Sequence, residues 1–265
     1  MSLSVVEEVL ALPILSNENP NWDINILEEK LLEAVKNCLP QKRPVSISLS
    51  GGVDSSLMTA MVRKIIGPKR EIHTFTIARN EEHPDILYAR IASKKFHTKH
   101  HEYFPGLQTI AWAIEQVRAI KRGKEIQKGN DAVFLFHAYI SGYTKEIITC
   151  DGIDEIMGGY WDHCDPDNNF RGNQKAAFKY HWQKLKPHHL ENLEIISNLC
   201  RVEVKLSYLQ EDFVKYAITI PLKDRTDIDE SKKPLRVLAR KYGIPKEIIE
   251  RKKLGFCDAL DEINR

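Results

Sequence analysis

A short segment rich in glycine and serine is the first part of the chain whose residue types suggest chemistry. Its residues are Ser50, Gly51, Gly52, Val53, Asp54, Ser55 and Ser56. The two glycines let the backbone turn tightly and approach a phosphate, and the serine hydroxyls stand beside the unpaired N–H groups of a helix start. Asp54 would repel a phosphate, so we expect it to bind a Mg²⁺ ion carried by a nucleotide. The segment therefore predicts a phosphate-binding loop.

Strands alternate with helices along the first 160 residues, and these elements must position the loop. Runs of branched and apolar residues predict strands over 45–49, 71–77 and 146–149, and we take 99–103 as a candidate for a further strand. Apolar residues at helical spacing predict helices that begin near Asp23, Ser55, Pro84, Gly106 and Asn130. The alternation predicts an α/β fold, a parallel twisted sheet with helices on both faces. Ligands bind at the carboxyl ends of such strands, where the glycine-rich segments 50–56 and 150–160 stand.

After Tyr160 the strand signals fade, which predicts a mostly helical C-terminal half. We divide the chain into an N-terminal lead-in and helix (1–40), a nucleotide-binding α/β region (41–160) and a helical region that completes the substrate site (161–265). The segment from Asp162 to Asn173 is rich in Asp, Asn, Pro and Gly, so it is predicted to be a mobile loop or a boundary. The two halves can still share one core.

Composition narrows the class of protein. The 265 residues are enough for one large domain or two small ones. Lys and Arg number 39 against 37 Asp and Glu, and a net charge of +2 makes a nucleic-acid or membrane partner unlikely in our interpretation. No apolar run approaches the ~20 residues that cross a bilayer, and no signal or transit peptide is visible, so we expect a cytoplasmic protein.

Cysteine and histidine spacing does not indicate a metal site. The five cysteines are widely spaced, which favours buried thiols over a disulfide framework or a zinc site. The histidines do not form a helical H-x-x-x-H pair with a third ligand. We therefore interpret the following as surface or core residues: His97, His100, His101, His181, His188 and His189.

The loop S-G-G-x-D-S-S resembles the PP-loop of the ATP pyrophosphatase superfamily, whose members cleave ATP between the α- and β-phosphates. It does not match G-x-x-x-x-G-K-[ST], the loop used for γ-phosphate transfer. Four further segments resemble the synthetase domain of asparagine synthetases and β-lactam synthetases, in family order. They are 149–160 for S-G-E-G-x-D-E-x-F-G-G-Y, 202–210 for V-E-x-R-x-P-F-L-D, 232–236 for K-x-x-L-R and 251–256 for R-x-K-x-G-F.

The resemblance implies ATP and Mg²⁺ as cofactors and assigns residues to them. Mg²⁺ would be bound by Asp54 and Asp154, although capping of a short helix is a compatible role for Asp154. The implied nucleotide contacts are Ser50, Gly51, Gly52, Asp54, Ser55, Ser56, Ile77 and Gly152. The implied catalytic residues are Lys232, which a one-residue shift in register would exchange for Lys233, and Asp151, where the family has Glu.

The implied reaction is amide formation. A substrate carboxylate attacks the α-phosphorus of ATP, pyrophosphate leaves, and ammonia or another amine then displaces AMP. The chain departs from the family at Asp151, Lys205, Ser207 and Gln210, so the identity of the carboxylate stays open. Two alternatives are a PP-loop enzyme that modifies RNA and a nucleotide-binding relative without turnover.

The family's glutaminase domain normally precedes the synthetase domain and begins with a cysteine after the initiator methionine. Here Ser2 occupies that position, and the residues before Val45 are too few for such a domain. We therefore expect ammonia to be taken directly or from a separate glutaminase subunit. A homo-oligomer is compatible with the sequence.

Overall fold

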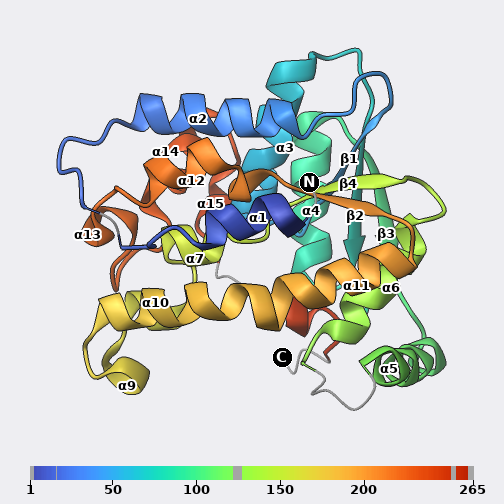
Figure 1. Cartoon of the computed structure of the whole chain (residues 1–265). Helices are drawn as coiled ribbons and strands as arrows, with labels where there is room; N and C mark the ends of the chain where they lie inside the picture. Colours follow the sequence, from blue (N-terminus) through green and yellow to red (C-terminus); the bar gives the residue numbers. More distant parts are fainter. Residues whose placement is uncertain (1–2, 16, 122–126, 252–254, 262–265) are drawn as a thin grey trace.

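The computed structural model describes residues 3–15, 17–121, 127–251 and 255–261. A parallel sheet lies at its centre, with five strands in the order β3-β2-β1-β4-β5 (Figure 1). The strands are β1 Val45–Ser48, β2 Ile72–Ile77, β3 Lys99–Tyr103, β4 Glu146–Thr149 and β5 Glu203–Leu206. The predicted parallel α/β sheet is confirmed.

Helices connect the strands and fill the C-terminal half. Up to residue 164 they are α1 Leu3–Leu10, α2 Ile24–Asn37, α3 Val53–Ile66, α4 Pro84–Phe96, α5 Leu107–Lys121, α6 Asn130–Ile140, α7 Ile153–Met157 and α8 Trp161–Cys164. Beyond it they are α9 Asp167–Phe170, α10 Gln174–Lys184, the π-helix η1 Leu185–Leu190, α11 Glu191–Leu199, the 3₁₀ turn η2 Ser207–Leu209, α12 Glu211–Ala217, α13 Leu222–Arg225, α14 Lys233–Lys241, α15 Lys246–Ile249 and the 3₁₀ turn η3 Phe256–Asp258. The predicted helical C-terminal half is confirmed. Among the described helices, none has both the length and the apolar composition needed to cross a membrane.

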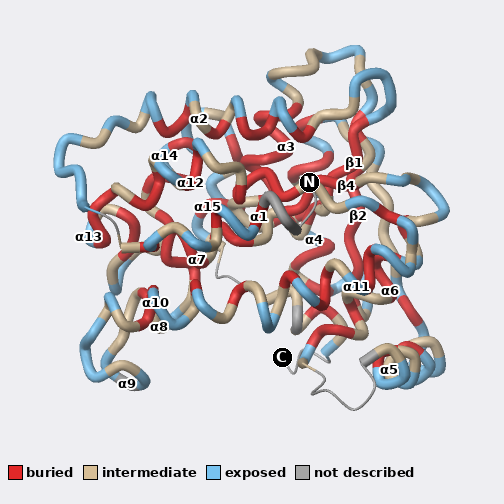
Figure 2. The backbone as a smooth tube through the Cα atoms, in the orientation of Figure 1, coloured by how far each residue is buried: buried red, intermediate tan, exposed pale blue. Residues whose placement is uncertain are grey.

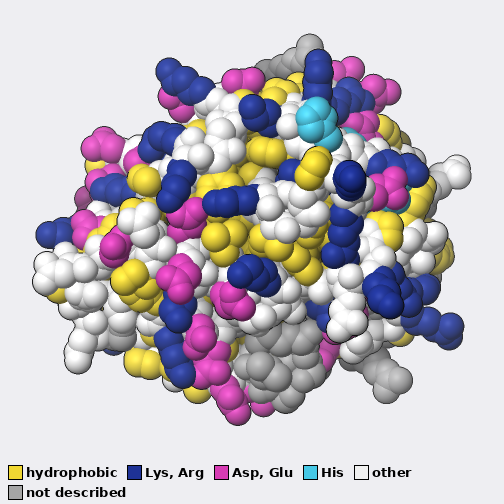
Figure 3. All heavy atoms as spheres, turned by 90° about the horizontal axis from the view of Figure 1, so that it is seen from above, with side chains coloured by type: hydrophobic (Ala, Val, Ile, Leu, Met, Phe, Trp, Pro, Cys, Tyr) yellow, Lys and Arg dark blue, Asp and Glu magenta, His cyan; other side chains and the backbone are white. Residues whose placement is uncertain are grey.

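Both faces of the sheet are covered, because neighbouring side chains of a strand point to opposite sides. In β4, Ile148 packs into a large core cluster with α3 and α4, whereas Ile147 packs into a smaller cluster with α5 and α6. Figure 2 shows the buried strands between helices whose outer sides are exposed. Figure 3 shows Lys and Arg interspersed with Asp and Glu on the face that α2 covers.

Local sequence signals account for the start of α2. Asp23 caps α2 by accepting a hydrogen bond from the Asn25 N–H at 2.7 Å, and Leu27, Leu31 and Val35 place a buried stripe on the core. The predicted helix from Ser55 begins two residues earlier, at Val53.

One strand was not identified from the sequence. The strand signals fade after Tyr160, yet β5 pairs in parallel with β4 at the edge of the sheet. Its residues alternate between polar and apolar types, but the alternation spans only four residues and only Leu206 is buried. The predicted loop 162–173 contains the short helices α8 and α9. The large core cluster draws on all three predicted regions, and their division stays a proposal.

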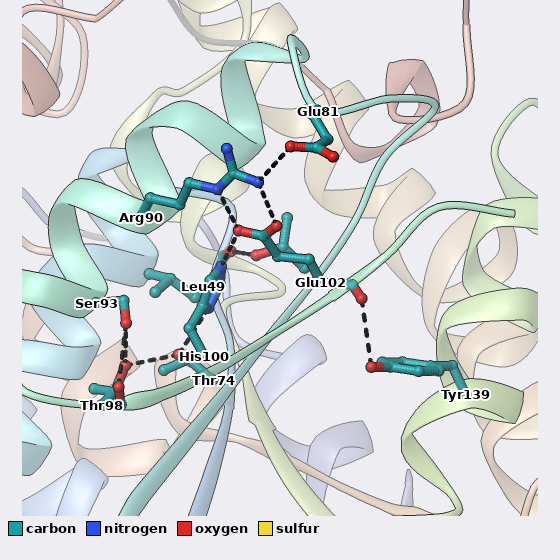
Figure 4. Close-up of polar contacts among 10 residues, drawn as sticks. Leu49, Thr74, Glu81, Arg90, Ser93, Thr98, His100, Glu102 and Tyr139 are labelled. Atoms are coloured by element: carbon teal, nitrogen blue, oxygen red, sulfur yellow. Dashed lines mark hydrogen bonds and ion pairs between the residues drawn. The ribbon is translucent and has the colours of Figure 1, made fainter.

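A polar network ties α4 to the neighbouring strands (Figure 4). Arg90 of α4 donates two hydrogen bonds to Glu102 of β3, with N–O distances of 2.6 and 2.7 Å. Thr74 of β2 contacts both Thr98 and His100 through its hydroxyl, at 2.8 and 2.9 Å. These contacts set the position of α4 relative to the sheet, and so the position of its first turn beside the glycine-rich loop.

A buried ion pair joins that first turn to the C-terminal segment. The guanidinium of Arg251 contacts the carboxylate of Asp85, and the two side chains are 5% and 4% exposed. Arg251 also donates a hydrogen bond to the Ser50 carbonyl at 2.7 Å, and its guanidinium lies 4.8 Å from the centre of the Tyr88 ring. Arg251 thus connects α4, the glycine-rich loop and the C-terminal segment.

We predict that Asp85→Ala lowers the free energy of unfolding by about 3–5 kcal/mol, because it leaves the buried guanidinium of Arg251 unpaired. Urea denaturation of the purified chain measures this. The control is Glu81→Ala, which removes an exposed partner of Arg90 and should cost less than about 1 kcal/mol. Equal losses for the two variants would contradict the role assigned to Asp85.

Candidate active site

The candidate site lies where the strand order reverses. β1 pairs with β2 on one side and with β4 on the other, so the connections that follow β1 and β4 separate and leave a crevice at their carboxyl ends. A cavity of about 350 Å³ opens there. Its walls come from the segments after β1 and β4, from α6 and η1, and from residues near 231–236 and 251–256. Residues 252–254 lie outside the described part of the chain.

The glycine-rich loop places the start of α3 at this cavity. Gly52 is the N-cap of α3 and provides no side-chain hydrogen bond, so the N–H groups of the first turn are open to an anion. Ser50 and Ser55 line the cavity with hydroxyls 3.3 Å apart. Gly51 has φ +68°, and a Cβ there would lie 2.3 Å from the Ala89 N atom. Glycine is therefore required at 51 by the close approach of α4.

Lys232 lies between the two predicted metal ligands. Its Nζ is 2.6 Å from an Asp154 carboxylate oxygen and also contacts the Asp54 carboxylate. Lys232 is 2% exposed. Burial alone would lower its pKa, but the charges of Asp154 and Asp54 outweigh burial and raise that pKa, so the ammonium stays protonated.

Backbone geometry makes this arrangement possible. Lys232 has φ +52°, a left-handed conformation that is uncommon for a residue with a side chain, and it immediately precedes α14. Gly159 leaves the space that the charges occupy, since a Cβ there would lie 1.8 Å from an Asp154 oxygen. The neighbouring Lys233 instead contacts Asp227 outside the cavity. The structure thus brings Lys232, rather than Lys233, to the predicted metal ligands.

The two aspartates fit a magnesium ion that arrives with a nucleotide. One oxygen of Asp54, Oδ1, is buried without a hydrogen-bond partner among the described residues. In the same part of the chain, no group of three or more His, Cys, Asp or Glu side chains could hold a metal ion. Mg²⁺ is commonly bound by one or two carboxylates together with substrate phosphates. The donor set therefore suits Mg²⁺ bound jointly by protein and phosphates.

Asp151 forms a pair with a histidine. Its carboxylate accepts a hydrogen bond from the Thr149 hydroxyl and lies 2.5 Å from the Nε2 atom of His189 on η1. Burial would raise the pKa of Asp151, but the charge and hydrogen bond of His189 outweigh it and lower that pKa. The sequence analysis gave His189 no role in the site, yet its side chain lines the cavity.

A further wall of the cavity, the α6 wall, is largely apolar and is formed by α6 together with residues of α11 and η3. His137 is 2% exposed, and its Nδ1–H donates to the Val133 carbonyl at 2.8 Å. Burial lowers the pKa of His137, so the ring is neutral, and its Nε2 atom has no hydrogen-bond partner among the described residues. The apolar residues of this wall are Val133, Phe136, Leu193 and Phe256.

Glu155, the residue after Asp154 in α7, is a further carboxyl group of the site. Glu155 accepts a hydrogen bond from the Tyr160 hydroxyl at 2.8 Å and is 5% exposed. Burial and the nearby charge of Asp154 raise the pKa of Glu155 to about 7. Both Glu155 and Tyr160 line the cavity. The sequence analysis named neither of them as a site residue.

Most of the predicted site residues meet at the cavity. Those that line it are Ser50, Gly52, Asp54, Ser55, Asp151, Gly152, Asp154 and Lys232. Three do not: Gly51 packs against α4, Ser56 is fully buried in α3, and the side chain of Ile77 lies in the smaller core cluster. Their contacts with a nucleotide stay predictions.

Sequence reasoning missed several residues of the site. Among these, Arg236 and Arg251 stand in the quoted motifs, whereas His137 and His189 had no recognisable signal. Of the four departures from the family pattern, Asp151 lines the cavity, while Lys205, Ser207 and Gln210 are not part of its described lining. Lys205 instead pairs with Glu203 at the edge of the sheet.

We compare the fold of this chain with two of the solved structures that are similar to it. An NMN synthetase from Francisella tularensis is 16% identical, with a TM-score of 0.48 over 89% of this chain and 78% of its own. An NH3-dependent NAD synthetase from Campylobacter jejuni is also 16% identical, with a TM-score of 0.37 over 66% of this chain and 92% of its own.

Comparison of sequences, unlike comparison of folds, identifies the family of this chain. Glutamine-hydrolyzing asparagine synthetases of Zea mays and Gallus gallus are each 26% identical to this chain, over 94% of it. The chain matches 45% of their length, somewhat less than half. Residues 26–190 and 170–263 match the protein family described as asparagine synthase. Because these matches together cover most of the sequence, the chain belongs to the asparagine synthase family.

Proposed function

We propose that the chain is an ATP-dependent ligase that adenylates a carboxylate and transfers the acyl group to ammonia or another amine. The observation that carries this proposal is the buried ammonium of Lys232 between Asp54 and Asp154, beside the start of α3. Anionic phosphates suit the helix N-terminus, and a fixed cation suits charge that develops on the α-phosphate. Membership of the asparagine synthase family supports the same reaction class.

In this proposal, residues from both halves of the chain take part in adenylation. The loop 50–56 binds the pyrophosphate portion of ATP through the first N–H groups of α3 and its serine hydroxyls. Asp54 and Asp154 would hold Mg²⁺, which neutralises phosphate charge when bound. Lys232 stabilises negative charge as the carboxylate oxygen attacks the α-phosphorus and pyrophosphate leaves.

The α6 wall and η1 form the rest of the proposed substrate site. Apolar side chains of α6 provide a surface for an organic group, and His137 offers a buried hydrogen-bond acceptor. Asp151 and His189 also line the cavity. Accordingly, we propose that region 41–160 binds the nucleotide and that region 161–265 completes the substrate site with Lys232 and His189.

We predict that ATP is converted to AMP and pyrophosphate rather than to ADP, because the loop is suited to bind the departing pyrophosphate. The purified chain is incubated with Mg·ATP, ammonium chloride and each of the twenty amino acids as the carboxylate, and the nucleotides are separated by anion-exchange chromatography. AMP that forms only with a particular carboxylate supports the proposal. Stoichiometric ADP, or no carboxylate-dependent AMP, would contradict it.

Lys232→Ala should lower kcat by ~10²-fold or more, because one charge partner of the transition state is lost. The matched control is Lys233→Ala, which removes the adjacent ammonium that contacts Asp227 outside the cavity and should change kcat by less than about 3-fold. AMP formation under saturating substrates measures both. A larger effect of the Lys233 variant would refute the role assigned to Lys232.

A further inference from the structure

The carboxylate of Asp151 has both oxygens engaged by the protein itself. Thr149 donates its hydroxyl hydrogen to one oxygen, and the Nε2 atom of His189 lies 2.5 Å from the other. The side chain of Asp151 is 19% exposed, and it is short because Asp has one methylene group fewer than Glu. A carboxylate held in this way is poorly placed to take a proton from a substrate.

His189 is better placed, because its side chain is 44% exposed and lines the cavity. Its Nε2 atom is committed to Asp151, and no contact of Nδ1 occurs within the described residues. When a carboxylate holds one N–H of an imidazole, the tautomer is set and the other nitrogen presents a lone pair. His189 also lies in the π-helix η1, an irregularity that is frequent at functional sites.

Titratable groups near His189 lie on three elements. Asp151, Asp154 and Glu155 belong to the segment after β4, the neutral His137 lies on α6, and His188 is the neighbour of His189 on η1. Burial would lower the pKa of His189, but the carboxylates, Asp151 foremost, raise it to about 9. A ring of this basicity accepts a proton in its neutral form, which becomes the main form above about pH 9.

We propose that His189 accepts the proton that the nitrogen nucleophile loses, and that Asp151 is the positioning residue that orients it. The inference rests on the proposed ligase function. The amine lone pair forms the C–N bond with the acyl carbon of the acyl-adenylate. The bond from that carbon to the phosphate oxygen breaks, and its electron pair leaves with AMP. The N–H proton moves to Nδ1 of His189 and then to solvent.

His189→Gln tests the proposal, with His188→Gln as the matched control on the same helix. Three rates are measured with the carboxylate that the parent chain activates: ATP–pyrophosphate exchange, amide formation from ammonium chloride, and hydroxamate formation from hydroxylamine. Hydroxylamine is included because it captures activated acyl groups without a catalytic base. His188 is exposed, and its variant should keep all three rates within about 3-fold of the parent.

For His189→Gln we expect amide formation from ammonia to fall by ~10²-fold, the usual size of a general-base contribution. Exchange and hydroxamate formation should remain within about 3-fold of the parent, since neither requires the base. An unchanged amide rate would overturn the proposal, and so would an equal fall of all three rates, which would indicate a structural role. A parent chain without carboxylate-dependent exchange would instead overturn the ligase function.

The pairing itself has a separate readout that requires no substrate. In the parent, the His189 ring should titrate near pH 9 by NMR, with ring signals assigned by comparison with His189→Gln. Asp151→Asn removes the main charge that raises this pKa, so the titration should move to lower pH, whereas His188→Gln should leave it unchanged. A His189 pKa that is the same in the parent and in Asp151→Asn would contradict the positioning role.

Discussion

The site depends on a buried cation that keeps two carboxylates together. Asp54 and Asp154 stand in the first turns of α3 and α7, the helices that follow the adjacent strands β1 and β4, and their negative charges would repel each other strongly in a medium of low dielectric constant. The ammonium of Lys232 offsets this repulsion, and its removal would leave the two carboxylates facing each other without a compensating charge. The left-handed backbone at Lys232 and the space left by Gly159 are the local consequences of fitting these charges together.

A second buried ion pair positions the elements that surround the glycine-rich loop 50–56. Arg251 and Asp85 connect the C-terminal segment to α4, and Arg251 also holds the Ser50 carbonyl. Through Arg90 and Glu102, α4 is in turn held against β3. The position of the glycine-rich loop therefore depends on contacts between residues more than 150 positions apart, although the loop sequence itself is short and local.

The cavity indicates where selectivity for a substrate can arise. Among the four departures from the family pattern, Asp151 belongs to the described lining, and His189 stands beside it. Lys205 forms ion pairs at the sheet edge, so its replacement of arginine does not act through direct contact with the described cavity wall. A change of substrate in this chain would thus depend first on the Asp151 and His189 pair and on the α6 wall that contains His137.

The sequence by itself determined the alternation of strands and helices, the glycine-rich turn before α3 and the selection of Asp54, Asp154 and Lys232 as site candidates, because periodicity, glycine-rich turns and ordered motifs are local signals. It could not distinguish Lys232 from Lys233 physically, since the choice depends on a left-handed backbone and two distant carboxylates. Only the tertiary structure decided that β5 completes the sheet, because a short edge strand is stabilised by pairing with β4 rather than by its own pattern. Only the tertiary structure also brought His189 to Asp151, because a π-helix turn and a contact across 38 residues leave no periodic trace in the chain.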